Sequence, residues 1–91
     1  MTRAAAEPPY RLAMVDGGYT VTEPVTGLRV EDAHLTRGMG RMHRLLIDRR
    51  DELAARDPAT LSAEERRDLE HLCSYPDAFL QHGLQLGRDA A

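Results

Sequence analysis

The hydrophobic pattern of this chain changes its period near residue 31. Before that point, residues 10–14 and 19–23 alternate apolar and polar side chains on either side of a turn at 16–18. Alternation is typical of a strand with one buried face. After it, apolar residues recur every three or four positions, as in an amphipathic helix. This second set is Leu35, Met39, Met42, Leu46 and Leu53. The pattern predicts an α+β fold, in which an N-terminal antiparallel hairpin or three-stranded meander packs against two to three C-terminal helices.

The turn sets the register of the predicted hairpin. Asp-Gly at 16–17 is a favoured pair for a two-residue type I′ turn, because glycine tolerates a positive φ. A two-residue loop places Met14 opposite Tyr19 and Leu12 opposite Val21, so that these large side chains share one side of the ribbon. We expect that side to bury the Leu and Met stripe of the first helix.

The ribbon is expected over 10–30, and its last residues, 28–30, are a candidate third strand. A first helix is predicted over 31–56. The acidic residues at 31–32 suit the positive end of a helix dipole, so we expect the helix to begin there. Gly38 and Gly40 interrupt its pattern, at a cost of about 1 kcal/mol each relative to Ala. We attribute them to close approach of the ribbon or of another helix, or to a break in the helix.

Two further helices are predicted over 62–83. Ser62 and Glu65 form a capping box, in which each side chain satisfies the other's backbone N–H. The Tyr75-Pro76 pair should separate the two helices, because proline lacks the backbone donor. The inner face of the first of these helices is expected to carry Leu69, Leu72 and Cys73.

The length of 91 residues predicts one small domain, over 10–87, between a flexible tail at 1–9 and a frayed end at 88–91. Leu, Ile, Val and Phe together number 18, so the core is thin, and a second copy or a partner is expected to help complete it. The single cysteine and the lack of a membrane-length apolar run predict a cytoplasmic protein without a membrane partner.

Charge is divided along the chain, whose formal net charge is −3. Residues 32–56 hold six Arg and four acids, a sum of +2, whereas 57–91 hold three Arg and seven acids, a sum of −4. Within the first helix Arg37, Arg41 and Arg44 are spaced to share one stripe, roughly opposite the apolar one. This stripe is either a solvated face or a docking surface for an acidic partner.

The acidic residues of the next helix have the opposite implication. They form either a solubilising face or a phosphate-like charge array offered to a protein that binds nucleic acid. The residues that we place in this second candidate surface are Glu64, Glu65 and Asp68.

Several functional classes lack support in the sequence. There is no Gly-rich phosphate loop, nucleophile elbow or metal-ligand spacing among the four His and one Cys. A recognition helix basic enough to neutralise DNA phosphates is also missing. We therefore expect no catalytic residue, no cofactor, no metal and no binding of free nucleic acid.

The remaining prediction is a non-enzymatic, small acidic protein that binds a protein or nucleoprotein partner as an inhibitor or adaptor. In size, acidity and lack of motifs it is similar to inhibitors of bacterial defence that phages and mobile elements carry, anti-CRISPR proteins among them. That likeness is one of type and rests on no matched residue. A DNA-linked transcriptional regulator or antitoxin is the alternative, and an accessory subunit of a larger complex is the third. A homodimer is possible in each case.

Overall fold

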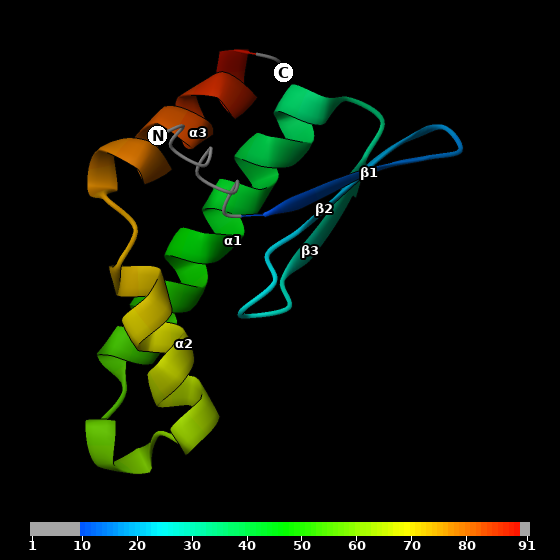
Figure 1. Ribbon diagram of the computed structural model, residues 1–91. Coiled ribbons are helices and arrows are strands. Elements are labelled where there is room, and N and C mark those ends of the chain that lie inside the picture. Colours follow the sequence, from blue (N-terminus) through cyan, green and yellow to red (C-terminus); the bar gives the residue numbers. More distant parts are fainter. Residues whose placement is uncertain (1–9, 90–91) are drawn as a thin grey trace, which may run out of the picture.

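The computed structural model describes residues 10–89 and confirms the α+β arrangement (Figure 1). Three antiparallel strands form one sheet in the order β1-β2-β3. They are β1 (Arg11–Val15), β2 (Gly18–Thr22) and β3 (Arg29–Asp32). Three α-helices follow, with a short 3₁₀ turn at Pro58–Thr60 before the second. They are α1 (Leu35–Ala55), α2 (Ala63–Cys73) and α3 (Asp77–Asp89).

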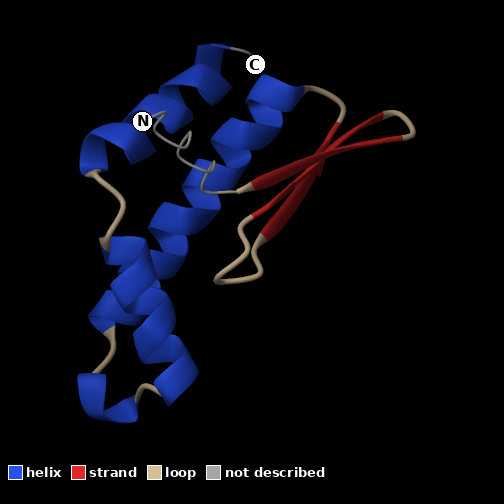
Figure 2. Ribbon diagram, in the orientation of Figure 1, coloured by secondary structure: helices blue, strands red, loops and turns tan. Residues whose placement is uncertain are grey.

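The long helix α1 organises the molecule, as Figure 2 shows. Its N-terminal half lies between the sheet and α3, and its C-terminal half lies beside α2. The predicted tail at 1–9 lies outside the described residues. Of the predicted frayed end, residues 88 and 89 belong to α3, and 90–91 lie outside the described range.

The hairpin has the predicted register. Met14 pairs with Tyr19, Leu12 pairs with Val21, and the loop contains two residues. The predicted type I′ turn is wrong, because that turn needs φ > 0 at both central residues and only Gly17 has it (84°).

The third strand exists, and it is longer than expected. It extends to Asp32, so the predicted helix start at residues 31–32 is wrong. Both residues pair with β2 instead, and α1 begins at Leu35 with His34 as its N-cap. The Asp32 carboxylate accepts the His34 N–H at 2.9 Å. It therefore binds the N-cap residue of α1 and is not part of the first turn of the helix.

The two glycines of α1 mark close contacts, and the helix is not broken. A Cβ on Gly38 would lie 3.1 Å from the Asp32 Cβ, which is the contact with the ribbon. A Cβ on Gly40 would lie 2.4 Å from the Cα of Gly87, which is the contact with α3. Both of the predicted close approaches are therefore confirmed, each at a different glycine.

The start and the end of α2 agree with the predicted signals, whereas the end of α3 does not. Both hydrogen bonds of the capping box form, at 3.1 Å and 2.9 Å, and α2 ends before Tyr75-Pro76. The expected stop of α3 near Gly83 is wrong, because the helix continues to Asp89. Gly83 lies against the His43 ring and so serves helix packing, as Gly87 does at the Gly40 contact.

The core lies between the three helices and the inner side of β2 and β3. Its largest fully buried apolar side chains are Met42, Leu46, Leu53, Leu72, Leu80 and Val21. Two expectations about burial are wrong. Leu12 and Met14 are 47% and 82% exposed, because α1 packs on β2 and β3 and leaves β1 uncovered. Cys73 is exposed rather than directed inward.

Candidate functional site

Arg37 and Arg41 lie on successive turns of α1 and share one carboxylate of the sheet. Arg37 Nε donates to both Asp32 oxygens at 3.0 Å. Arg41 Nη1 donates to Asp32 Oδ2 at 3.2 Å and to the Glu31 carbonyl oxygen at 2.9 Å. The Asp32 side chain is only 2% exposed, whereas both arginine side chains reach solvent. The sheet therefore fixes the position of two guanidinium groups.

The electrostatics of this cluster keep Asp32 ionised. Hydrogen bonds donated by Arg37, by the His34 N–H and by Arg41 outweigh desolvation, and they hold the pKa of Asp32 well below its ordinary value. The same hydrogen bond raises the pKa of Arg37. One buried negative charge thus faces two partly exposed positive charges.

A shallow groove of about 240 Å³ runs between α1 and α3 beside this cluster. Its floor is the glycine contact of the two helices together with Leu84, and its sides carry four arginines. We call it the arginine groove; its residues are Arg37, Gly40, Arg41, Arg44, Leu84, Gly87 and Arg88. The predicted basic stripe is thus brought together with a fourth arginine from α3, which the sequence pattern did not suggest.

The two remaining arginines of the groove are weakly engaged. Arg44 lies 3.8 Å from Asp48, with both side chains more than half exposed. Arg88 makes no ion pair within residues 10–89. Exposed pairs of this kind contribute little to stability, so these guanidinium groups remain open to another anion.

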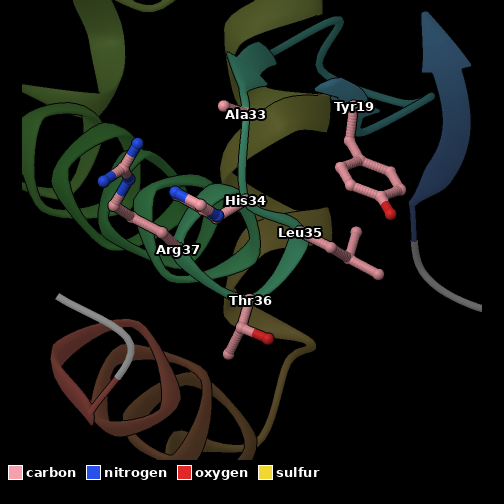
Figure 3. A pocket seen from close by; sticks show the side chains of 6 residues that line it. All are labelled: Tyr19, Ala33, His34, Leu35, Thr36 and Arg37. Atoms are coloured by element: carbon pink, nitrogen blue, oxygen red, sulfur yellow. The ribbon is translucent and has the colours of Figure 1, made fainter. Parts of the chain in front are cut away.

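A second hollow, of about 420 Å³, adjoins the groove at the start of α1. Figure 3 shows His34 and Arg37 on one side of it and Tyr19 and Leu35 on the other. It is open to solvent.

The three acids of the predicted surface on α2 have different surroundings. Glu65 is used by the capping box and by an ion pair of 2.6 Å with Arg56 at the end of α1. Asp68 is buried, and its Oδ1 has no hydrogen-bond partner in the described part of the chain. Glu64 is exposed. Arg56 follows the C-terminal end of α1, whereas the arginine groove lies on its N-terminal half.

The structure also contains a buried polar cluster that was not predicted. Glu23, in the loop between β2 and β3, is fully buried. Its carboxylate accepts the backbone N–H of Val25 at 3.1 Å, and both the N–H (2.6 Å) and the hydroxyl of Thr26. His71 Nε2, from α2, lies 2.9 Å from Glu23 Oε1, and the Tyr75 hydroxyl is 3.5 Å from the same atom.

This cluster anchors the loop to α2. Burial alone would raise the pKa of Glu23, but the hydrogen bonds from Thr26, Val25 and His71 outweigh it, and the pKa lies below its ordinary value. Burial, with the neighbouring carboxylate, raises the pKa of Tyr75 to about 12. A carboxylate, an imidazole and a phenol are the usual groups of acid–base catalysis. Here both carboxylate oxygens are already occupied by donors, so the cluster has a structural explanation.

An aromatic contact chain extends the cluster toward β1. The Tyr75 ring stacks on Phe79 at 5.6 Å between centroids, and Phe79 lies 4.8 Å from the His43 ring. His43 is buried, and desolvation lowers the pKa of its ring. Tyr10 closes the chain, with its hydroxyl 3.5 Å from His43 Nε2.

No family of proteins, curated sequence or solved structure matches this chain. Within residues 10–89, none of the helices is long and apolar enough to cross a membrane, and no three His, Cys, Asp or Glu side chains are grouped as metal ligands would be.

Sequence reasoning missed the role of Glu23 and misassigned Asp32. Glu23 and His71 are 48 residues apart, and no spacing rule relates a loop acid to a distant helix. The turn itself could be read locally, since Pro24 and Gly27 are typical turn residues, but its closure by the Glu23 side chain could not. Asp32 was noticed, but it was assigned to the dipole of a helix that begins three residues later.

Proposed function

We propose that this protein is a non-catalytic binding protein that holds an acidic surface of a protein partner in its arginine groove and so acts as an inhibitor or adaptor. The observation that supports the proposal is the convergence of four arginines on one apolar floor. Within residues 10–89, two acids, Asp32 and Asp48, pair with them, which leaves an excess of two positive charges in this groove on a chain of net charge −3.

The chemistry of the groove favours carboxylates. Guanidinium groups form planar, paired hydrogen bonds with carboxylate and phosphate alike. The groove is short, its floor is apolar, and the rest of the molecule is acidic, which disfavours the long phosphate array of a duplex. A protein segment with several Asp or Glu side chains can pair with the arginines and also pack on the apolar floor.

The more specific form of the proposal is an inhibitor that occupies the site of a cytoplasmic nucleoprotein effector, as phage-borne inhibitors do. The main alternative remains a DNA-linked regulator, which would use the same arginines on phosphates. The two are separated by which anion the groove prefers.

The test measures fluorescence anisotropy of a labelled ten-residue glutamate peptide at low salt, with the full chain as titrant. Replacing both Arg44→Glu and Arg88→Glu reverses two charges without touching the Asp32 cluster. We expect the affinity to fall about tenfold, since each exposed ion pair contributes up to about 1 kcal/mol. Raising the salt concentration should weaken binding of the parent chain.

The matched control is the pair Arg66→Glu and Arg67→Glu on α2. Both arginines are exposed, so the net charge changes equally while the groove is unchanged. Equal loss of binding in the two double variants would show that net charge alone attracts the peptide, and would refute the proposal. Tighter binding of a labelled 20-base-pair duplex than of the peptide, lost in the groove variant, would establish the DNA-linked alternative instead.

A further inference from the structure

The outer edge of β1 is open. Every residue of this strand is exposed, and within residues 10–89 no strand lies beyond it in the sheet. Its sequence, Arg-Leu-Ala-Met-Val, carries one charge and three large apolar side chains. Natural proteins usually protect such an edge, because its unpaired N–H and C=O groups can pair with another strand.

The opposite edge of the sheet differs in each respect. β3 carries three charged residues among four, and α1 packs against it. Charged side chains are one of the usual means of blocking an edge. Within residues 10–89, the edge of β3 therefore has such protection and the edge of β1 does not.

The backbone of β1 presents a symmetric pattern to a second strand. Val15 and Gly18 pair directly across a two-residue loop, so alternate residues of β1, namely Arg11, Ala13 and Val15, exchange hydrogen bonds with β2. Leu12 and Met14 consequently direct their N–H and C=O groups away from the sheet. These two residues lie one on each side of Ala13.

We propose that the second strand is β1 of another copy of this chain, which forms a symmetric dimer with a continuous six-stranded antiparallel sheet. A two-fold axis through Ala13 pairs Leu12 with Met14 of the second copy and Met14 with its Leu12. Both outward residues of each copy then complete their hydrogen bonds, and their side chains form one apolar row on the same side as Val21.

Charge supports the same register. The two-fold axis places Arg11 opposite Val15 of the second copy, next to its Asp16. One ion pair between Arg11 and Asp16 can therefore form at each end of the shared ladder. No like charges face each other. Neither Arg11 nor Asp16 has an ion-pair partner within residues 10–89, and the dimer supplies one for each. The proposal goes beyond the arginine groove and is independent of it.

The first test is the mass of the full chain by light scattering across a concentration series. The parent chain should rise from 10.2 kDa toward twice that mass as concentration increases. Met14→Lys places a charge on the edge and should keep the protein monomeric throughout. Val25→Lys is the matched control, since it also introduces a charge at an exposed apolar residue, and it should dimerise as the parent does. A parent chain that stays at 10.2 kDa throughout overturns the proposal.

The second test fixes the register. Ala13 faces Ala13 of the second copy as a non-hydrogen-bonded pair, with Cα atoms about 4.5 Å apart, which is within the range of a disulfide. In a Cys73→Ser background, Ala13→Cys should oxidise to a covalent dimer far faster than Val25→Cys. Equal rates for the two variants would contradict the register and the proposal.

A measurement on the parent chain avoids dependence on any variant. Hydrogen exchange of the Leu12 and Met14 amides should slow as concentration rises, whereas the amides of β3 should not respond. Unchanged exchange at Leu12 and Met14 across a concentration range in which the mass doubles would place the interface elsewhere. The arginine-groove variants should dimerise normally, so failure of either proposal is recognised separately.

Discussion

Replacing the buried carboxylate, Glu23→Gln, tests the account of the loop–helix anchor most directly. The change preserves the shape of the side chain and removes its charge. In the parent chain the two oxygens accept from the Val25 and Thr26 amides, from the Thr26 hydroxyl and from His71. An amide offers one acceptor oxygen, so its NH₂ group must face donors at the other position.

The expected cost follows from that mismatch. A buried N–H that loses its acceptor costs about 1–3 kcal/mol, and hydrogen bonds to a charged group are stronger than neutral ones. We expect a loss of about 2–4 kcal/mol, a large share of the roughly 5–10 kcal/mol typical of a domain of this size. The midpoint of thermal unfolding should fall by roughly 10–20 °C. Glu31→Gln, at an exposed ion pair with Arg29, is the isosteric control and should change stability by no more than about 0.5 kcal/mol.

The pH dependence gives an independent check. Because the folded pKa of Glu23 lies below its ordinary value of 4.5, its stabilisation is complete above pH 4.5 and is lost as the pH falls through the folded pKa. The difference in free energy of unfolding between the parent and Glu23→Gln, from urea denaturation followed by circular dichroism, should therefore narrow below pH 4.5. A difference that stays constant down to pH 3, or a variant as stable as the parent at pH 7, would refute this reasoning.

Three further predictions concern packing and exposure. Gly40→Ala should lower stability by about 1–3 kcal/mol in a thermal melt, because its Cβ would meet the backbone of Gly87, whereas Gly38→Ala should be nearly neutral, since a gain in helix propensity offsets a small steric adjustment. Ser62→Ala should cost about 1 kcal/mol in urea denaturation through loss of the capping box. Cys73 should react completely with a thiol reagent in the native protein, and protection until unfolding would contradict its exposure.

Three local signals in the sequence predicted local structure correctly. The two-residue loop fixed the hairpin register, Ser62 with Glu65 set the start of α2, and Pro76 separated the last two helices. In each case the determining residues lie within a few positions of what they determine. The helical period also identified three buried residues of α1, Met42, Leu46 and Leu53, because spacing reflects burial directly.

Features that depend on tertiary placement were not accessible in this way. The side of the hairpin that carries Leu12 and Met14 was correctly grouped, but its burial depended on where α1 crosses the sheet. Asp32 is compatible with a helix N-terminus, and only the pairing of β3 with β2 assigns it to a strand. The candidate site shows the same limit, because Arg88 joins the arginine groove through the crossing of α1 with α3.

Replacing Asp32 tests whether binding of an acidic peptide in the arginine groove depends more on net charge or on the positioning of the arginines. Asp32→Asn would remove a negative charge that opposes an acidic ligand, and by that effect alone it should strengthen binding. It would also release Arg37 and Arg41 from the carboxylate that positions them. Ordering a long side chain costs conformational entropy that an exposed, screened ion pair does not fully recover.

We therefore expect positioning to dominate, and the variant should bind the glutamate peptide roughly threefold to tenfold more weakly in the anisotropy assay. Its folding must be confirmed by circular dichroism, because the same substitution removes the ion pairs that Asp32 makes between β3 and α1. Tighter binding by a folded variant would show that the groove acts through net charge, and that the sheet contributes nothing to its geometry.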